Sequence, residues 1–351
     1  METDDLPVTG TEAARSARRA RTDRATAWRR ALRWETGLAV LVVFVAVLGS
    51  ATSSEFLTSG NMFNLAVTTG EVAIMALPMT LIVISGEIDL SVASTLGMSS
   101  ALLGVLWSDH WPMIAIFVVV AAVGAVAGLV NGLLVTRLGL PSLAVTIGTL
   151  ALYRGVALIL LGAKAISTFP APYSTTGIIP VPHTDLPWST LIFVVLAAVA
   201  GVVLHATPTG RSIYAMGASP EAARYAGIRV KRIKTLLFVA SGVTCALAGV
   251  LWTFRLDTAV QNNGLGMELN VVAVVLLAGV SIFGGKGSIP SVVLGVLVFA
   301  GIQNALLLTN FNQEATGLVV GGLLLLSVFA PGAGSLAGRI RGKLHGRLSD
   351  P

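Results

Sequence analysis

The polar residues with the most chemical potential form one short run, Ser85-Gly86-Glu87-Ile88-Asp89-Leu90-Ser91, between two apolar stretches. Glu87 and Asp89 are two residues apart, so this pair of carboxylates could bind a cation, relay a proton or cap the ends of neighbouring helices. In a purely structural alternative, Asp89 or Ser91 caps the following helix and Glu87 faces cytoplasmic water. The spacing alone leaves these alternatives open.

Two further carboxylates lie in apolar surroundings. Glu71 is inside one apolar run and Glu268 opens another. A charge within a membrane span costs several kcal/mol unless it is paired or hydrated, so each such residue is a candidate for function. Either could line a polar pathway, or pair with Arg154 or Arg255 inside a helix bundle.

Motifs of enzymes and cofactor sites are not found in the sequence. The single cysteine, Cys245, excludes an internal disulfide and a cysteine cluster, and no Gly-x-Ser-x-Gly elbow occurs. The run from Phe283 to Ser288 resembles a phosphate-binding loop, but Val280 replaces the first glycine and Gly287 follows the lysine. Its glycines indicate a tight turn between two helices. The histidines lack the paired spacing of zinc ligands and are His110, His183, His205 and His345. No cofactor, metal or catalytic residue is predicted.

The composition identifies the elements that must position these groups. Of 351 residues, 54% are hydrophobic and 11% are charged, whereas a soluble domain carries about 25% charged residues. The 38 glycines fit helices that pack closely within a bilayer. The fold class is therefore an all-α polytopic membrane protein, and soluble enzymes, DNA-binding proteins and secreted scaffolds are excluded.

Ten apolar runs have about the length that crosses a bilayer, about 20 residues. Closely spaced pairs leave room for broken or re-entrant helices. The predicted spans lie near 36–56, 63–84, 90–107, 112–135, 141–162, 188–206, 235–256, 268–284, 289–309 and 314–331.

The basic residues orient this bundle. With ten spans, all of the 23 Lys and Arg residues except Arg154, Lys164 and Arg255 fall on one side. The positive-inside rule then places both termini in the cytoplasm. The net charge of +6 is thus an orientation signal, and no nucleic-acid partner is expected. The predicted domains are a basic tail at 1–35 that anchors at the lipid surface, a transmembrane domain at 36–331 and a cytoplasmic tail at 332–351.

A short repeat suggests duplicated halves. The nine residues from Gly128 to Thr136 match those from Gly301 to Thr309 at Gly, Asn, two Leu and Thr. These segments end the fourth and ninth spans, which run in opposite directions, as in transporters with inverted repeats. A chance match between Leu-rich helices is the alternative. The pathway candidates are the polar residues of these segments, Asn131, Gln303 and Asn304, together with the carboxylates Glu71, Glu87 and Asp89. Gly124, Gly128 and Gly132 also form a small-residue ridge for helix packing.

The loop at about 207–234 carries a short predicted helix. Ser219 is a good N-cap, Pro220 fits the first helical position, Glu221 complements the positive helix end, and Gly227 ends the helix. A helix of one or two turns is unstable alone and needs a partner surface. That surface is another protein or, alternatively, anionic lipid.

This loop resembles the coupling loop of ABC-importer permeases, in which Glu-Ala-Ala is followed by Gly. The runs 86–92, 153–155, 210–227 and 283–288 are similar to the branch that imports monosaccharides such as ribose, xylose and rhamnose, and the sugar-like autoinducer-2. The resemblance covers nearly all of 55–331. The family commonly has Gly where this chain has Glu87, a variant associated with rhamnose-type permeases.

The resemblance implies a permease dimer, homomeric or heteromeric, with the solute pathway on the shared axis. Separate cytoplasmic ABC ATPase subunits would hold the short helix, and an extracytoplasmic solute-binding protein would dock on outer loops that include 165–187. The coupling residues would be Pro220, Glu221, Ala222, Ala223 and Gly227. From the residues alone, an ion-coupled carrier using Glu71, Glu87 or Asp89 is the alternative. The resemblance also implies a multi-pass transport subunit of the bacterial plasma membrane.

Overall fold

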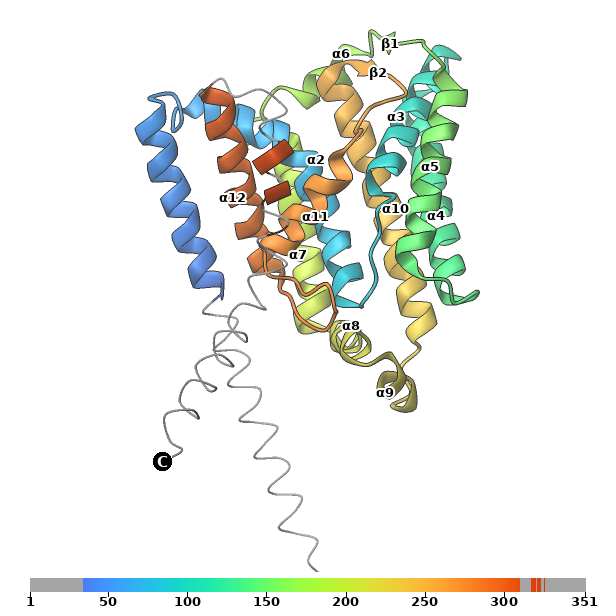
Figure 1. Cartoon of the computed structure of the whole chain (residues 1–351). Helices are drawn as coiled ribbons and strands as arrows, with labels where there is room; N and C mark the ends of the chain where they lie inside the picture. The colour runs from blue at the N-terminus through green and yellow to red at the C-terminus, as the bar shows by residue number, and fades with distance from the viewer. Residues whose placement is uncertain (1–33, 310–316, 320, 323–324, 326–351) are drawn as a thin grey trace, which may run out of the picture.

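The protein is a bundle of helices that lie roughly side by side, as the computed structural model shows (Figure 1). The structure describes residues 34–309 together with 317–319, 321–322 and 325. The tail at 332–351, nearly all of the tail at 1–35 and most of the predicted span at 314–331 lie outside these residues.

Nine helices make up the described part of the bundle. They are Trp34–Thr52, α2 (Ser59–Ile84), α3 (Val92–Ser108), α4 (Met113–Thr136), α5 (Ser142–Leu161), α7 (Trp188–Ala206), α10 (Val230–Leu256), α11 (Met267–Leu277) and α12 (Ile289–Leu308). The connecting segments contain β1 (Ile166–Ser167), α6 (Ala171–Ser174), the 3-10 helix η1 (Thr175–Gly177), α8 (Pro208–Ala218), α9 (Pro220–Tyr225) and β2 (Thr258–Ala259).

Among the described residues, seven helices are long and apolar enough to cross a membrane, and α3 and α11 are shorter apolar helices. Each begins near a predicted span. The prediction for 268–284 is wrong in length, because α11 has 11 residues and reaches only about 16 Å. Gly279, two residues beyond its end, takes a φ of +80°, and the apolar sequence continues as a turn. The count of ten spans and the location of the termini stay predictions.

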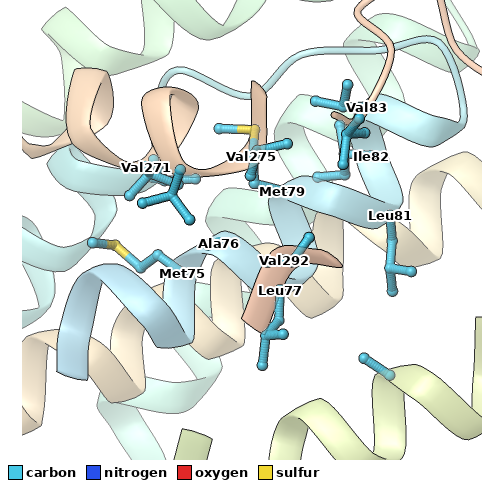
Figure 2. Close-up of a cluster of buried hydrophobic side chains, with 14 of the residues drawn as sticks. Met75, Ala76, Leu77, Met79, Leu81, Ile82, Val83, Val271, Val275 and Val292 are labelled. Carbon is cyan, nitrogen blue, oxygen red and sulfur yellow. The ribbon is translucent and has the colours of Figure 1, made fainter. Parts of the chain in front are cut away.

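Helix α2 forms the centre of the bundle. It is buried on all sides from Thr69 to Ile84, as expected for a helix that is apolar all round. Figure 2 shows its side chains meeting Val271 and Val275 of α11 and Val292 of α12. Pro78 lies within this helix.

The predicted glycine ridge on α4 is confirmed. A Cβ added at Gly124 would lie 2.5 Å from the carbonyl oxygen of Gly242, and one at Gly128 would lie 2.1 Å from that of Phe238. Helix α10 therefore packs against α4 backbone to backbone, which side chains larger than hydrogen would prevent. The close approach fixes where the residues of α10 stand relative to the rest of the bundle.

The connecting segments gather at two ends of the bundle. One end, the α9 face, carries α8, α9 and the turn at 281–288 (Figure 1). The other end, the β-bridge face, carries α6 and the two strands, which pair antiparallel with Ile166 opposite Ala259 and Ser167 opposite Thr258. Each end of α10 therefore meets one of these faces.

The two copies of the short repeat occupy equivalent places. Both end a helix, and the hydroxyls of Thr136 and Thr309 donate to the carbonyls of Gly132 and Ala305, four residues back. Helix α4 ends at the α9 face, whereas α12 begins there, since Tyr214 of α8 donates to the carbonyl of Gly287. The two helices thus run in opposite directions, and duplication of the two halves stays a prediction.

Candidate functional site

The α9 face presents a short, exposed helix. As predicted, the Ser219 hydroxyl caps α9 by accepting from the backbone N–H of Ala222 at 3.2 Å. Pro220 and Glu221 lie in its first turn, and Gly227 follows its end with a φ of +80°. Ala223 is buried against the bundle, whereas Glu221, Ala222 and Gly227 are exposed. The helix is therefore fixed on one side and free on the other.

Helix α8 attaches α9 to the bundle, and the sequence analysis did not predict it. Thr207 accepts from the N–H of Gly210, and Pro208 is the first helical residue. This N-cap and proline were the signal that could have located it. Ile213 and Met216 are fully buried. The hydroxyl of Tyr214 donates to Gly287, and burial raises the pKa of Tyr214 to about 12.

Four glycines form a tight junction beneath α9. A Cβ on Gly217 would lie 1.8 Å from the carbonyl oxygen of Ile84 and 2.6 Å from the N–H nitrogen of Gly285. A Cβ on Gly284 would lie 3.0 Å from the Cα of Gly86. The end of α8, the end of α2 and the turn before α12 thus touch through their backbones. We call these residues, Gly86, Gly217, Gly284 and Gly285, the glycine junction.

The junction explains why glycines occur in the runs 86–92 and 283–288. Gly86, Gly284 and Gly285 have φ values of +85°, +80° and +72°, a region that glycine enters without steric cost. The turn predicted between two membrane helices at 283–288 is confirmed, with Ser288 as the N-cap of α12. Both motifs thus meet the segment that carries α9.

Glu87 is held by a cation of α10. Its Oε1 accepts from the Nζ of Lys234, and the two side chains are 17% and 10% exposed. Glu87 therefore pairs with Lys234 and keeps some exposure, and the alternative in which it faces cytoplasmic water stays a prediction. Because α10 begins at Val230, Lys234 stands on a helix rather than in the loop that the sequence suggested. Burial of both partners strengthens the attraction between them.

Asp89 accepts three hydrogen bonds. Its Oδ1 accepts from the N–H and the hydroxyl of Ser91 at 3.0 and 2.6 Å, and its Oδ2 accepts from the hydroxyl of Ser241 at 2.9 Å. The Nδ2 of Asn131 in turn donates to Ser91 at 2.8 Å. Ser91 is the N-cap residue of α3, but its side chain makes no capping hydrogen bond. The carboxylate thus links the start of α3 to α4 and α10.

At the other end of α10, Glu71 and Arg255 form a more deeply buried ion pair. The Nε of Arg255 donates to the Oε1 of Glu71 at 2.8 Å, and the side chains are 13% and 1% exposed. The guanidinium carbon lies 4.6 Å from the ring centroid of Trp252. The pairing of Glu71 with Arg255 is one of the two predicted alternatives. Arg154 instead donates to the carbonyls of Asn263 and Ala93.

The segment 162–187, which contains the predicted outer loop at 165–187, packs on this same end of α10. The N–H of Phe169 donates to the carboxylate of Asp257 at 3.1 Å. The rings of Phe169 and Tyr173 lie 6.0 and 5.8 Å from that of Phe254. Together with the pairing of β1 and β2, these contacts attach the segment to α10.

Among the described residues, no hydrogen bond joins the remaining pathway candidates to one another. Asn131 is engaged with Ser91 on α4. Asn304 is buried on α12 and its Nδ2 has no partner in the described part of the chain. Gln303 is half-buried beside it. Their role in a solute pathway stays a prediction. Lys234 and Ser241, which bind Glu87 and Asp89, were missed because no sequence spacing predicts contacts so far apart along the chain.

Comparison with known proteins supplies the class of this chain. Residues 61–328 match the family described as branched-chain amino acid transport system / permease component. The autoinducer 2 import system permease protein LsrD of Photorhabdus luminescens is 30% identical, over 84% of this chain and 90% of its own. LsrD of Yersinia enterocolitica is 31% identical over the same shares.

The second permease of that name is also a relative. The autoinducer 2 import system permease protein LsrC of Yersinia pseudotuberculosis is 33% identical, over 82% of each chain. No solved structure matches the chain. The family match begins at Asn61 in the first turn of α2, covers every described helix after it and extends past the last described residue, Leu325. The chain therefore belongs to this family of membrane-embedded transport permeases, whose members are transport subunits and not enzymes.

Proposed function

We propose that this chain is the transmembrane subunit of an ATP-driven ABC importer and that its α9 face is cytoplasmic. The observation that carries the proposal is α9 itself. One side is anchored through Ala223 and the glycine junction, while Glu221, Ala222 and Tyr225 are exposed. Tyr225 is 94% exposed. A capped helix of six residues with an anchored base suits a contact that a separate ATPase grips.

The solute is proposed to be a monosaccharide or a sugar-like molecule of the rhamnose or autoinducer-2 type. Support comes from the relatives, which are named as autoinducer 2 import permeases, and from Glu87 in the position where the resembling family commonly has Gly. Asn131, Gln303, Asn304 and Glu71 remain the proposed pathway residues. Asn304 has an amide nitrogen without a partner in the described structure.

Three kinds of partner complete the proposed importer. A second permease subunit, identical or different, would form the pathway with this one; the similarity to both LsrC and LsrD supports such pairing. A solute-binding protein would dock on the β-bridge face, where β1, α6 and η1 lie. Membrane lipid would cover the apolar outer surface, which includes Val118, Ile147 and Val195, each more than half exposed.

The alternative, an ion-coupled carrier, finds less support in the geometry. Each of its three proposed carboxylates already has a partner within the chain: Glu71 binds Arg255, Glu87 binds Lys234, and Asp89 binds Ser91 and Ser241. Binding of a sodium ion or a proton by these carboxylates would compete with their ion pairs and hydrogen bonds.

The test is co-expression with a candidate ATPase and binding protein, followed by uptake into proteoliposomes of labelled rhamnose and autoinducer-2 in separate assays. We expect ATP-dependent uptake of one probe and co-purification of the ATPase. Glu221→Arg should abolish both without reducing membrane insertion. The control is Glu55→Arg, an exposed glutamate of the β-bridge face that should retain both activities. Uptake by the purified chain alone, driven by an ion gradient, would overturn the proposal.

A further inference from the structure

We infer that the segment from Glu87 to Ser91 and helix α10 form a clamp through which movement of α9 reaches α3, α4 and α5. This inference rests on the proposed function, since it assigns a way for the motion of an ATPase to enter the bundle. It makes Glu87 and Asp89 positioning residues of the coupling machinery, and not ligands of a transported ion.

The clamp has two contacts on one face of α10. Glu87 binds Lys234 and Asp89 binds Ser241. Lys234 and Ser241 stand two helical turns apart, so their side chains project from the same face at a separation of about 10 Å along the axis. Two contacts at this separation prevent α10 from rotating or sliding past the segment without breaking at least one of them.

One side of the clamp is joined directly to α9. Only residues 226–229 separate the end of α9 from the start of α10. The backbone N–H of Ile228 donates to the carbonyl of Ala223 at 3.0 Å, and that of Val230 donates to Ile228 at 2.8 Å. This connection cannot lengthen without breaking these hydrogen bonds. Displacement of α9 must therefore displace the first turns of α10, where Lys234 stands.

The other side of the clamp is joined to three helices. Ser91 is the first residue before α3 and accepts from Asn131 of α4. The N–H of Ile88 donates to the hydroxyl of Ser142 at 3.1 Å, at the start of α5. The segment thus receives force from α10 and distributes it to the ends of α3, α4 and α5.

The two contacts differ in how readily they can open. The Glu87–Lys234 pair keeps some contact with solvent, with side chains 17% and 10% exposed, so water can replace either partner when the contact breaks. Asp89 is 2% exposed and receives three hydrogen bonds. The ion pair is therefore the part of the clamp that opens and closes, and Asp89 is the fixed part.

A native cysteine on α10 can report the separation of this helix from the segment Glu87–Ser91. Cys245 is the only cysteine and is fully buried. It lies on α10 one turn beyond Ser241, with its Sγ 3.9 Å from that hydroxyl. The rate at which N-ethylmaleimide alkylates Cys245 therefore measures how far α10 has separated from the segment, and no cysteine needs to be introduced.

The experiment uses the permease in complex with its ATPase subunits in proteoliposomes, and requires no solute. Alkylation of Cys245 is measured with no nucleotide and with ATP plus vanadate. In the unmodified complex we expect at least a fivefold difference between the two conditions. Glu87→Gln and Lys234→Met should each reduce it to less than twofold while the ATPase stays bound. Glu87→Lys combined with Lys234→Glu should restore at least half of it.

Arg137→Gln is the matched control, because Arg137 is an exposed cation at the same face, at the end of α4; it should keep the full difference. The inference is overturned if Glu87→Gln retains the nucleotide-dependent difference, if the exchanged pair does not restore it, or if the unmodified complex shows none. Failure of any ATPase to bind the unmodified chain would instead overturn the proposed function.

Discussion

The two ends of α10 each carry an ion pair, and the pairs differ in burial and in what they hold. At the α9 face, Lys234 binds a carboxylate of the connection between α2 and α3, and both side chains retain some exposure. At the β-bridge face, Arg255 binds a carboxylate in the middle of α2 that is 1% exposed. About 30 Å of helix separates them, the thickness of a bilayer core.

The difference in burial indicates which of the two ion pairs opens at the lower cost in free energy. A buried ion pair that loses one partner leaves an uncompensated charge, so the structure is strongly biased against opening it. A pair near solvent opens at much lower cost. The contacts at the end beside α9 are therefore easier to open, as the proposed clamp requires, whereas the other end holds α10, α2 and the segment 162–187 together.

The largest expected effect tests the fixed end. Arg255→Met leaves the Glu71 carboxylate buried without its cation, which should reduce the free energy of unfolding by about 3–5 kcal/mol. Denaturation of the detergent-purified chain measures this loss. Adding Glu71→Gln removes the orphaned charge and should recover most of the stability. A loss below about 1 kcal/mol for Arg255→Met would contradict the assignment of this end as the fixed one.

The glycine junction, at the end proposed to move, gives the next effect. Gly217→Ala would place a methyl group 1.8 Å from the carbonyl oxygen of Ile84. Overpacking against backbone that cannot rotate away should cost about 3 kcal/mol and shift α8. Co-purification of the ATPase should fall with it. Gly148→Ala, where nothing lies within 4 Å, is the control and should be neutral or slightly stabilising.

A smaller loss of stability is expected for Lys234→Met. Because the pair is partly exposed, the free energy of unfolding should fall by about 1–2 kcal/mol, between the values for surface and buried pairs. Denaturation of this variant beside Arg255→Met compares the two ends directly. If Lys234→Met destabilised the chain more than Arg255→Met, the contrast between a movable and a fixed end would fail.

The smallest effect concerns the attachment of the segment 162–187. Asp257 has a φ of +46° and accepts from the N–H of Phe169. Asp257→Ala removes the acceptor and strains the backbone, so unfolding should become easier by about 1–2 kcal/mol. Asp257→Asn keeps an acceptor and tolerates the left-handed conformation, and should stay near the unmodified stability. Equal destabilisation by both substitutions would show that the bond to Phe169 contributes nothing.

Hydropathy located the membrane helices well because bilayer thickness dictates the length of an apolar run. It did not detect that the run at 268–284 contains a short helix and a turn, since Gly279 and the residues after it are as compatible with a turn as with a span. Local signals were equally informative for α9, where Ser219, Pro220 and Gly227 act within one or two turns.

The partners of the carboxylates could not be predicted. Glu87 and Lys234, or Glu71 and Arg255, come together through the packing of α2 and α10, which depends on glycines such as Gly128 that bring backbones into contact. The sequence analysis identified those glycines as a ridge, but it had no means to say which helix would face them. The chemistry of the site therefore depends on tertiary contacts more than on any motif.

The length of α10 has a mechanical consequence. Its 27 residues contain no proline, and they form a rod of about 40 Å. If this rod pivots by about 3° around its end at the β-bridge face, the end beside α9 shifts by about 2 Å, enough to turn a good hydrogen bond into none. A small tilt at the fixed end would thus change the contacts beside α9, about 40 Å away, without any change inside the helix.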